Sequence, residues 1–138
     1  MSKLVRLSLS IEQPLFEQLE ALVDKGGYTN RSEFVRNLIR NRLVEEEWEG
    51  DAEALGTISL LFDHHARGLA ARLTHKQHHF AGKVLATTHI HLDEHLCSEM
   101  IMVQGQAEDI KQLADQLDRE KGVLHAKLAI GSIGKRLS

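Results

Sequence analysis

The stretch Lys76–Met102, KQHHFAGKVLATTHIHLDEHLCSEMIM, contains five of the nine histidines of this 138-residue chain and its single cysteine. Within it, His89 and His91 lie two residues apart in an apolar run rich in β-formers. If that run is a strand, both imidazoles leave the same face, because strand side chains alternate with period two. A hairpin through Asp93-Glu94-His95 would return Cys97 to that face. Two imidazoles and a thiol on rigid backbone predict a site for a late transition metal.

A stable small metal site usually has four ligands, and His78, upstream of the strand, is the best fourth by ligand type. It could reach the metal within one chain or across a subunit boundary. Three nitrogens and one thiolate in a plane suit nickel(II) or copper(II), whereas a tetrahedral arrangement indicates zinc. Glu99, two residues after Cys97 on the same strand face, is expected to orient a ligand imidazole. The remaining histidines stay ambiguous: His64, His65, His75, His79, His95 and His125.

The composition is typical of a folded intracellular chain. An apolar content of 42% and a single proline favour a packed core over disorder. One cysteine excludes an intramolecular disulfide framework and fits a reducing compartment. No apolar run approaches the roughly 18 residues of a membrane span, and the N-terminus lacks the apolar segment of a signal peptide. We therefore expect a cytoplasmic protein with no membrane partner.

The charge is distributed unevenly along the chain. Residues 1–43 hold seven Lys/Arg against five acids, whereas residues 44–53 hold six acids and no base. All nine histidines follow residue 63. A basic segment, an acidic hinge and a histidine-rich segment predict two domains with separate roles. The expected divisions are a DNA-binding domain at 1–48, an acidic linker at 49–55, and a metal-binding and oligomerisation domain at 56–138.

The first domain is expected to be strand–helix–helix. Apolar residues alternate with mostly polar ones from Leu4 to Ile11, which predicts a short strand. Pro14 suits the first turn of a helix that ends at Gly26-Gly27, and Asn30 followed by Glu33 resembles the capping box of a second helix, with Thr29 as the other cap candidate. Such a unit is too small to bury its own core comfortably, so dimerisation is expected.

Two of these strands paired across a dimer would form a ribbon that fits the DNA major groove. Its polar face would present Arg6, Ser8 and Ser10 to base edges. The amides at the start of the second helix, at Asn30, Arg31 and Ser32, would hold a phosphate. The alternative is an ordinary edge strand with a helical hairpin, because the excess of two positive charges is modest for DNA binding.

The second domain alternates strands and helices in the order β-α-β-β-α-β. This order predicts an α+β, ferredoxin-like domain with an antiparallel sheet and both helices on one face. The expected elements are strands at Thr57–Phe62, Lys83–Leu92, Glu99–Val103 and Val123–Ile130 and helices at Arg67–His78 and Ala107–Lys121.

At this point the chain resembles the nickel-responsive transcriptional regulator (NikR) family over nearly its whole length. The matching pieces are RLSLSI, GYTNRSE, the QHH that follows a helix, THIHLDEHLC and the closing GVLHAKL. The spacing of His78, His89, His91 and Cys97 reproduces the spacing of the family's ligands.

The resemblance implies a ribbon-helix-helix dimer joined to an ACT-type regulatory domain, in a homotetramer built as a dimer of dimers. It implies one square-planar nickel(II) per subunit, held by His89, His91 and Cys97 of one chain and His78 of its neighbour. It implies a repressor of nickel-uptake genes that binds double-stranded operator DNA and has no small-molecule substrate.

This chain departs from the family pattern at two places. The family can hold a second cation between its domains with an acidic pair; Glu33 matches the first member, but Asn37 stands at the second. The family's helix after the first regulatory strand can touch DNA phosphates through a basic pair, of which Ala66 replaces the first and Arg67 remains. Arg67 is therefore a predicted phosphate contact, with a shallower salt dependence than a pair would give.

Three other functions use parts of the same pattern. A metal-dependent hydrolase would need a general base beside an open metal position, and no motif supports one. A domain that binds an amino acid would leave the histidine–cysteine cluster unexplained. A regulator that senses cobalt, copper or zinc uses the same residues and is the main alternative.

Overall fold

A computed structural model describes residues 3–138 of the chain. The chain divides into two compact units. One extends through Leu43 and includes Arg136–Ser138, and the other comprises Val44–Lys135.

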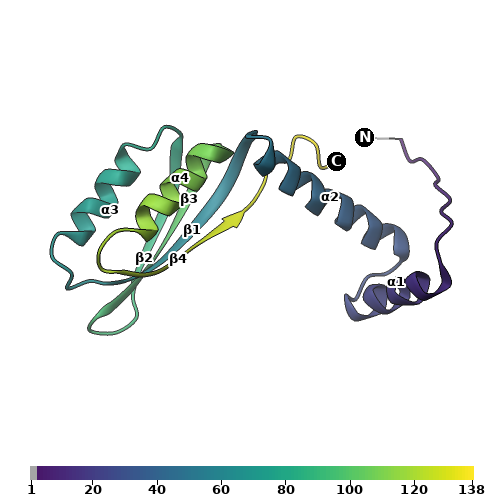
Figure 1. The fold of residues 1–138 in the computed structure, drawn as a ribbon, viewed down its shortest axis with the longest axis horizontal. Helices are drawn as coiled ribbons and strands as arrows, with labels where there is room; N and C mark the ends of the chain where they lie inside the picture. The colour runs from purple at the N-terminus through teal and green to yellow at the C-terminus, as the bar shows by residue number, and fades with distance from the viewer. Residues whose placement is uncertain (1–2) are drawn as a thin grey trace. The chain divides into compact units, whose positions relative to one another are not determined.

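The second unit is an antiparallel sheet with two helices on one face (Figure 1). Its elements are β1 (Glu53–Asp63), α3 (Leu69–His78), β2 (Lys83–His91), β3 (Leu96–Gln106), α4 (Ala107–Asp118) and β4 (Val123–Ile130). The strand order β2-β3-β1-β4 and the βαββαβ sequence confirm the expected α+β, ferredoxin-like fold. Strands β1 and β3 are longer than predicted, because residues before and after the predicted ranges also join the sheet ladder.

The core lies between the sheet and its two helices. Buried and less buried residues alternate along β1, as expected of a strand with one face covered. The covered face consists of Ile58, Leu60 and Phe62 of β1 with Cys97, Ile101 and Val103 of β3, and it packs against Leu69, Leu73, Ile110, Leu113 and Leu117 of the helices. The opposite face leaves Ile90, Met100 and Met102 exposed.

Helix α3 is fixed to the rest of the unit by polar contacts as well as by its apolar face. Arg72 donates from Nε to the Glu120 carboxylate at 2.8 Å, and Lys76 Nζ lies 3.3 Å from the same carboxylate. Gly122 has φ +104°, and a Cβ there would lie 2.6 Å from the Cβ of Ala66. The loop after α4 can therefore approach the start of α3 only because residue 122 is glycine.

The first unit contains α1 (Gln13–Lys25) and the greater part of α2 (Arg31–Glu49). Pro14 stands in the first turn of α1 and Gly26 follows its end, as predicted. Asn30 accepts a hydrogen bond from the Glu33 amide at 2.9 Å, which confirms Asn30 as the cap of α2. The Glu33 carboxylate, however, pairs with Arg36.

The predicted strand at Leu4–Ile11 is not a strand in the single chain. Residues 3–12 are exposed and belong to no helix or strand. A β-ladder needs a hydrogen-bonded partner, and the prediction assigned that role to the same segment of a second chain. The pairing across a dimer therefore stays a prediction.

The predicted linker at 49–55 overlaps the end of one helix and the start of one strand. Helix α2 continues to Glu49 and β1 begins at Glu53, so only residues 50–52 separate them. The acidic run is helical because Trp48 is almost fully buried and its indole Nε1 donates to the Gly131 carbonyl at 2.9 Å. This packing sets the helix end against the sheet unit, which composition alone could not reveal.

Within residues 3–138, no helix combines the length and apolarity needed to cross a bilayer.

Replacing Glu120 with Gln should lower the free energy of unfolding by about 1 kcal/mol at pH 7, because two charge-assisted contacts to α3 are lost and both cationic partners are partly solvated. The Arg72 hydrogen bond lowers the pKa of the Glu120 carboxyl below its ordinary 4.5, against the effect of burial, and Lys76 lowers it further. This stability is present above pH 4.5 and is lost as the pH falls through the lower folded-state pKa.

Guanidinium denaturation of both proteins at several pH values measures this difference. The gap between them should shrink as the medium is acidified below about pH 4.5. Glu94→Gln, at an exposed position in the β2–β3 turn, is the matched control and should have little effect. A Glu120→Gln variant as stable as the parent at pH 7 would show that this carboxylate does not stabilise the packing of α3.

Candidate metal centre

The register of β2 against β3 sets the geometry of the centre. His91 lies directly opposite Cys97, and His89 lies directly opposite Glu99. Since residues two apart share a face, these four side chains stand on the same face of the hairpin. Cys97 and Glu99 are buried on the face that α3 and α4 cover, while both histidines on the edge strand remain exposed.

Three ligand atoms converge at one end of this hairpin. Cys97 Sγ lies 3.2 Å from His91 Nδ1. The ligand atoms of His64, His91 and Cys97 all lie within 4.8 Å of one another. In the part of the chain that the structure describes, this is the one group of three or more histidine, cysteine or acidic side chains that could hold a metal ion. A thiol and two imidazoles suit cobalt, nickel, copper or zinc rather than calcium or magnesium.

His89 stands beside this group and faces its cross-strand neighbour, Glu99. Its Nδ1 lies 3.8 Å from Glu99 Oε2, and its ring packs edge-on against Phe62 with centroids 5.7 Å apart. The ring centroids of His89 and His91 are 5.1 Å apart. Glu99 is in turn held by Gln77 of α3, whose Nε2 donates to Glu99 Oε1 at 3.1 Å. The carboxylate therefore lies between the hairpin and the helix that carries His78.

The environment of Cys97 favours the protonated thiol. Burial raises the pKa of the Cys97 thiol, and the negative charges of Asp93, Asp63 and Glu99 raise it further. A metal ion that takes this sulfur as ligand must therefore displace a proton. Once the proton is lost, the buried thiolate needs a neighbouring cation to offset the free-energy cost of burying its charge.

A tight turn keeps the two strands in this register. Asp93 Oδ1 accepts hydrogen bonds from the His95 and Leu96 amides, both at 2.8 Å, and these bonds lower the pKa of the Asp93 carboxyl. The His64 amide donates to the His95 carbonyl at 2.8 Å. The end of β1 is thereby tied to the turn, which brings the His64 side chain to the centre.

His78 does not join this group within one chain. It is the last residue of α3 and is exposed. Its nearest aromatic neighbour among the described contacts is His79, at 6.0 Å between ring centroids. The sequence left open whether His78 reaches the metal within one chain or across a subunit boundary. In the single chain, His78 does not reach the other candidate ligands.

The predicted DNA-contacting residues lie in the first unit, apart from Arg67. Arg6, Ser8 and Ser10 are exposed in the extended N-terminal segment, and Arg67 is exposed before α3. At the start of α2 the side chains are already engaged. Asn30 caps the helix, and Arg31 pairs with Glu20 and lies over the Phe16 ring at 5.1 Å. Ser32 is exposed in the first turn.

The position that departs from the family's acidic pair has a local partner. Asn37 Nδ2 donates to the Tyr28 hydroxyl at 2.6 Å, and the Tyr28 ring packs edge-on against Phe34. Asn37 therefore helps to join the α1–α2 turn to α2, which a neutral amide can do without a counter-ion.

Sequence reasoning missed His64 as a member of the cluster and Gln77 as the partner of Glu99. Both are brought to the centre by contacts between residues far apart in the chain. The pairing of Phe62 with Cys97 in the β1–β3 ladder explains the position of His64, which follows Phe62 by two residues and so lies near the sulfur. That register depends on the tertiary fold and is absent from local pattern.

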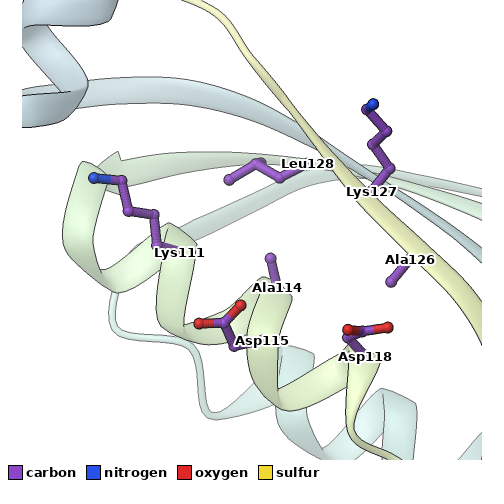
Figure 2. A pocket seen from close by; sticks show the side chains of 7 residues that line it. All are labelled: Lys111, Ala114, Asp115, Asp118, Ala126, Lys127 and Leu128. Atoms are coloured by element: carbon purple, nitrogen blue, oxygen red, sulfur yellow. The ribbon is translucent and has the colours of Figure 1, made fainter.

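A separate hollow of about 140 Å³ lies between α4 and β4, away from these residues (Figure 2). It is lined by Lys111, Ala114, Asp115, Asp118, Ala126, Lys127 and Leu128. Figure 2 shows the two lysine side chains extending away from each other, and Lys111 donates to the Trp48 carbonyl at 2.9 Å. None of the predicted site residues lines this hollow.

Comparisons with known proteins identify both parts of the chain. Residues 55–130 match the model of the NikR C-terminal nickel-binding domain, and residues 5–46 match the ribbon-helix-helix protein, copG family. Proteins carrying the name nickel-responsive regulator are similar over their full length: 44% identical in Geobacter sulfurreducens and 43% in Geotalea uraniireducens, each over 99% of both chains. One from Pyrococcus horikoshii is 40% identical over 98% of this chain and 99% of its own.

Among solved structures, the ACT domain from the GTP pyrophosphokinase of Chlorobium tepidum is similar with a TM-score of 0.49. That match covers 56% of this chain and 100% of the ACT domain at 14% sequence identity.

The burial and raised pKa of Cys97 predict slow reaction with a thiol-specific disulfide reagent at neutral pH, because the thiolate is the reactive form and the sulfur is inaccessible. In the native, metal-free protein we expect labelling to be about tenfold or more slower than in guanidinium. Absorbance of the released thiolate measures both rates on the chain's one cysteine. Equal rates in the two states would show that the sulfur is not enclosed as described.

Proposed function

Because this chain belongs to the NikR family of nickel-responsive transcriptional regulators, a family of regulators and not of enzymes, we propose that it represses nickel-uptake genes by binding operator DNA when nickel(II) occupies the histidine–cysteine centre. The observation that carries this proposal is the hairpin register, which puts His89, His91 and Cys97 on one face with His91 Nδ1 3.2 Å from the sulfur. A thiolate with imidazoles suits nickel(II) among the late metals.

The proposed ligand set is His89, His91 and Cys97 of one chain with His78 of a neighbouring chain, and one nickel(II) per subunit. Bound nickel supplies a cross-link between the two chains. The exposure of His78 at the end of α3 and its separation from the cluster of its own chain support donation to a neighbour. His64 is the competing fourth ligand, because its ring nitrogen already lies within 4.8 Å of His91 and Cys97.

The proposed assembly is a homotetramer formed as a dimer of dimers. In the first unit Leu22, Leu38 and Ile39 are half exposed on the two helices, and Phe34 is the one buried apolar residue there among those described. In the second unit the uncovered sheet face exposes Ile90 and Met100. Two separate apolar surfaces support two separate contacts between chains, which is what a dimer of dimers requires.

The proposed DNA contacts divide between base edges and phosphates. Arg6, Ser8 and Ser10 would read bases from a ribbon formed by two chains, and their exposure supports that role. At the start of α2, phosphate would be bound chiefly by backbone amides near Asn30 and Ser32, because the Asn30 side chain is engaged in capping.

Two further residues are proposed as phosphate contacts. Arg31 contributes mainly through its amide, since Glu20 already pairs with its guanidinium. Arg67, exposed before α3, adds a side-chain contact.

The coupling between the centre and DNA has to be a difference in affinity. The ligands and the ribbon belong to different units, so the metal does not act on the ribbon directly. It can favour DNA binding only if the arrangement of chains that binds DNA also binds the metal more tightly than other arrangements do. When His78 binds the metal of a neighbouring chain, it would hold the end of α3 in one position. Gln77, the preceding residue, already links α3 to Glu99, which faces His89. The end of α3 would therefore be connected both to the centre of its own chain, through Gln77, and to the centre of the neighbouring chain, through His78.

The main alternative is the same architecture sensing cobalt, copper or zinc. Copper(II) should bind this donor set more tightly than nickel(II) by the Irving–Williams order, so affinity alone does not identify the sensed metal. The discriminating measurement is DNA binding with each metal in turn. A thiolate-to-nickel charge-transfer band that is absent from Cys97→Ala would identify the sulfur as a ligand.

His78→Ala should retain part of the metal affinity, because three ligands remain, and should lose most nickel-dependent DNA binding. The measurement is a nickel(II) titration of DNA binding by fluorescence anisotropy, on a fragment that the parent protein selects from genomic DNA in the presence of nickel. His64→Ala is the matched control and should respond to nickel as the parent does.

The opposite pattern, with nickel-dependent DNA binding lost in His64→Ala and kept in His78→Ala, would show that the fourth ligand is His64 of the same chain and not His78 of a neighbour. Equal DNA binding by the parent with nickel and with a strong chelator would overturn the proposed function itself.

Glu99→Gln should weaken nickel(II) binding by about 10- to 100-fold without removing a ligand, because the neutral amide orients the His89 imidazole less strongly than the carboxylate does. Competition with a chromophoric chelator measures the affinity, and the charge-transfer band should persist at full loading. Unchanged affinity would show that Glu99 has only a packing role.

A further inference from the structure

Two histidines outside the centre form a pair on the last turn of α3. His75 and His79 are four residues apart, a spacing that puts side chains on the same side of a helix. Their ring centroids lie 4.1 Å apart with the planes inclined by 37°, and both residues are exposed. Neither belongs to the group formed by His64, His91 and Cys97. Helical histidines at this spacing can bind one metal ion together.

The backbone fixes which nitrogen of His79 is available. His79 Nδ1 lies 2.9 Å from the His75 carbonyl oxygen. A carbonyl oxygen can only accept a hydrogen bond, so Nδ1 carries the proton and, in the neutral ring, Nε2 keeps its lone pair. Donation of one ring N–H to a backbone carbonyl is the arrangement that orients histidine ligands in metal sites. His79 is thus already oriented as an Nε2 ligand.

The pair opens on a hollow that the proposed function does not use. A cavity of about 340 Å³ lies between the end of α3 and α4. Its lining supplies oxygen groups that can complete a coordination sphere directly or through water. It is lined by His75, Lys76, His79, Phe80, Ala81, Asp109, Gln112, Leu113 and Gln116. Lys76 is the one cation there, and its ammonium is neutralised by Glu120 at 3.3 Å.

We propose that His75 and His79 bind a second late divalent cation in this cavity, with water filling the other positions. Two imidazoles suit copper(II), zinc(II) or nickel(II), and copper(II) should bind most tightly. The absence of a thiolate makes this site weaker for soft ions than the centre that contains Cys97. Because the two ligands span one helical turn, the ion holds the end of α3 helical.

This bridging has a consequence that rests on the proposed function. His78 lies between the two ligands, with its ring 6.0 Å from that of His79. Fixing the last turn of α3 reduces the conformational freedom that His78 loses when a neighbouring chain captures it. The second ion would therefore strengthen nickel(II) binding at the first centre, and by linkage the reverse would also hold.

The direct test uses the full-length protein loaded with one equivalent of nickel(II) and then titrated with further nickel(II), so that no tighter-binding metal displaces the ion of the first centre. Calorimetry should detect a second ion per chain. Its association constant should fall about tenfold or more in His75→Ala and in His79→Ala. His125→Ala, at an exposed histidine on β4, is the matched control and should bind the second ion as the parent does.

Two further readouts keep the outcomes distinct. In Cys97→Ala, the charge-transfer band of the first centre should disappear while the second ion still binds, which separates failure of one site from failure of the other. In protein already loaded with one equivalent of nickel(II), further nickel(II) should slow hydrogen exchange at the amides of residues 78–80 in the parent and not in His75→Ala. No second ion in the parent, or a second ion bound as tightly by His75→Ala and His79→Ala as by the parent, would overturn the proposal.

Discussion

The antiparallel register of β2 against β3 is the constraint on which the chemistry of this protein depends. With His91 opposite Cys97 and His89 opposite Glu99, two imidazoles, a thiol and a carboxylate share one sheet face. A slip by one residue would send the side chains of the moved strand to the opposite face. The Asp93 turn and the bond from the His64 amide to the His95 carbonyl resist such a slip at the end where His91 and Cys97 lie.

The same face of the hairpin also belongs to the hydrophobic core, and this gives the centre its electrostatic character. Cys97 is fully buried next to Phe62, so its thiol has a raised pKa, and the thiolate form is costly without a cation beside it. The histidines stand on the edge strand and remain exposed. A metal ion therefore meets a protected sulfur and accessible imidazoles, with Glu99 between them and α3.

Helix α3 is the element that connects the centre to other parts of the unit. Gln77 holds Glu99, and Arg72 and Lys76 hold Glu120 in the loop after α4. Its end carries three histidines with different surroundings: His75 and His79 line a cavity, and His78 is exposed outside it. A short helix fixed by polar contacts at its middle and exposed at its end is well suited to respond to ligands captured there.

The sequence by itself determined the order of elements in the second unit, the shared face of His89 and His91 and the candidate ligand types. These features depend on period, local turn chemistry and spacing, which a single segment encodes. Only the tertiary structure decided that His64 joins His91 and Cys97, that Gln77 supports Glu99, and that Trp48 at the end of α2 is buried with its indole bonded to the Gly131 carbonyl. Each of these depends on contacts between residues far apart in the chain, and the register and packing that create such contacts are set by the whole core.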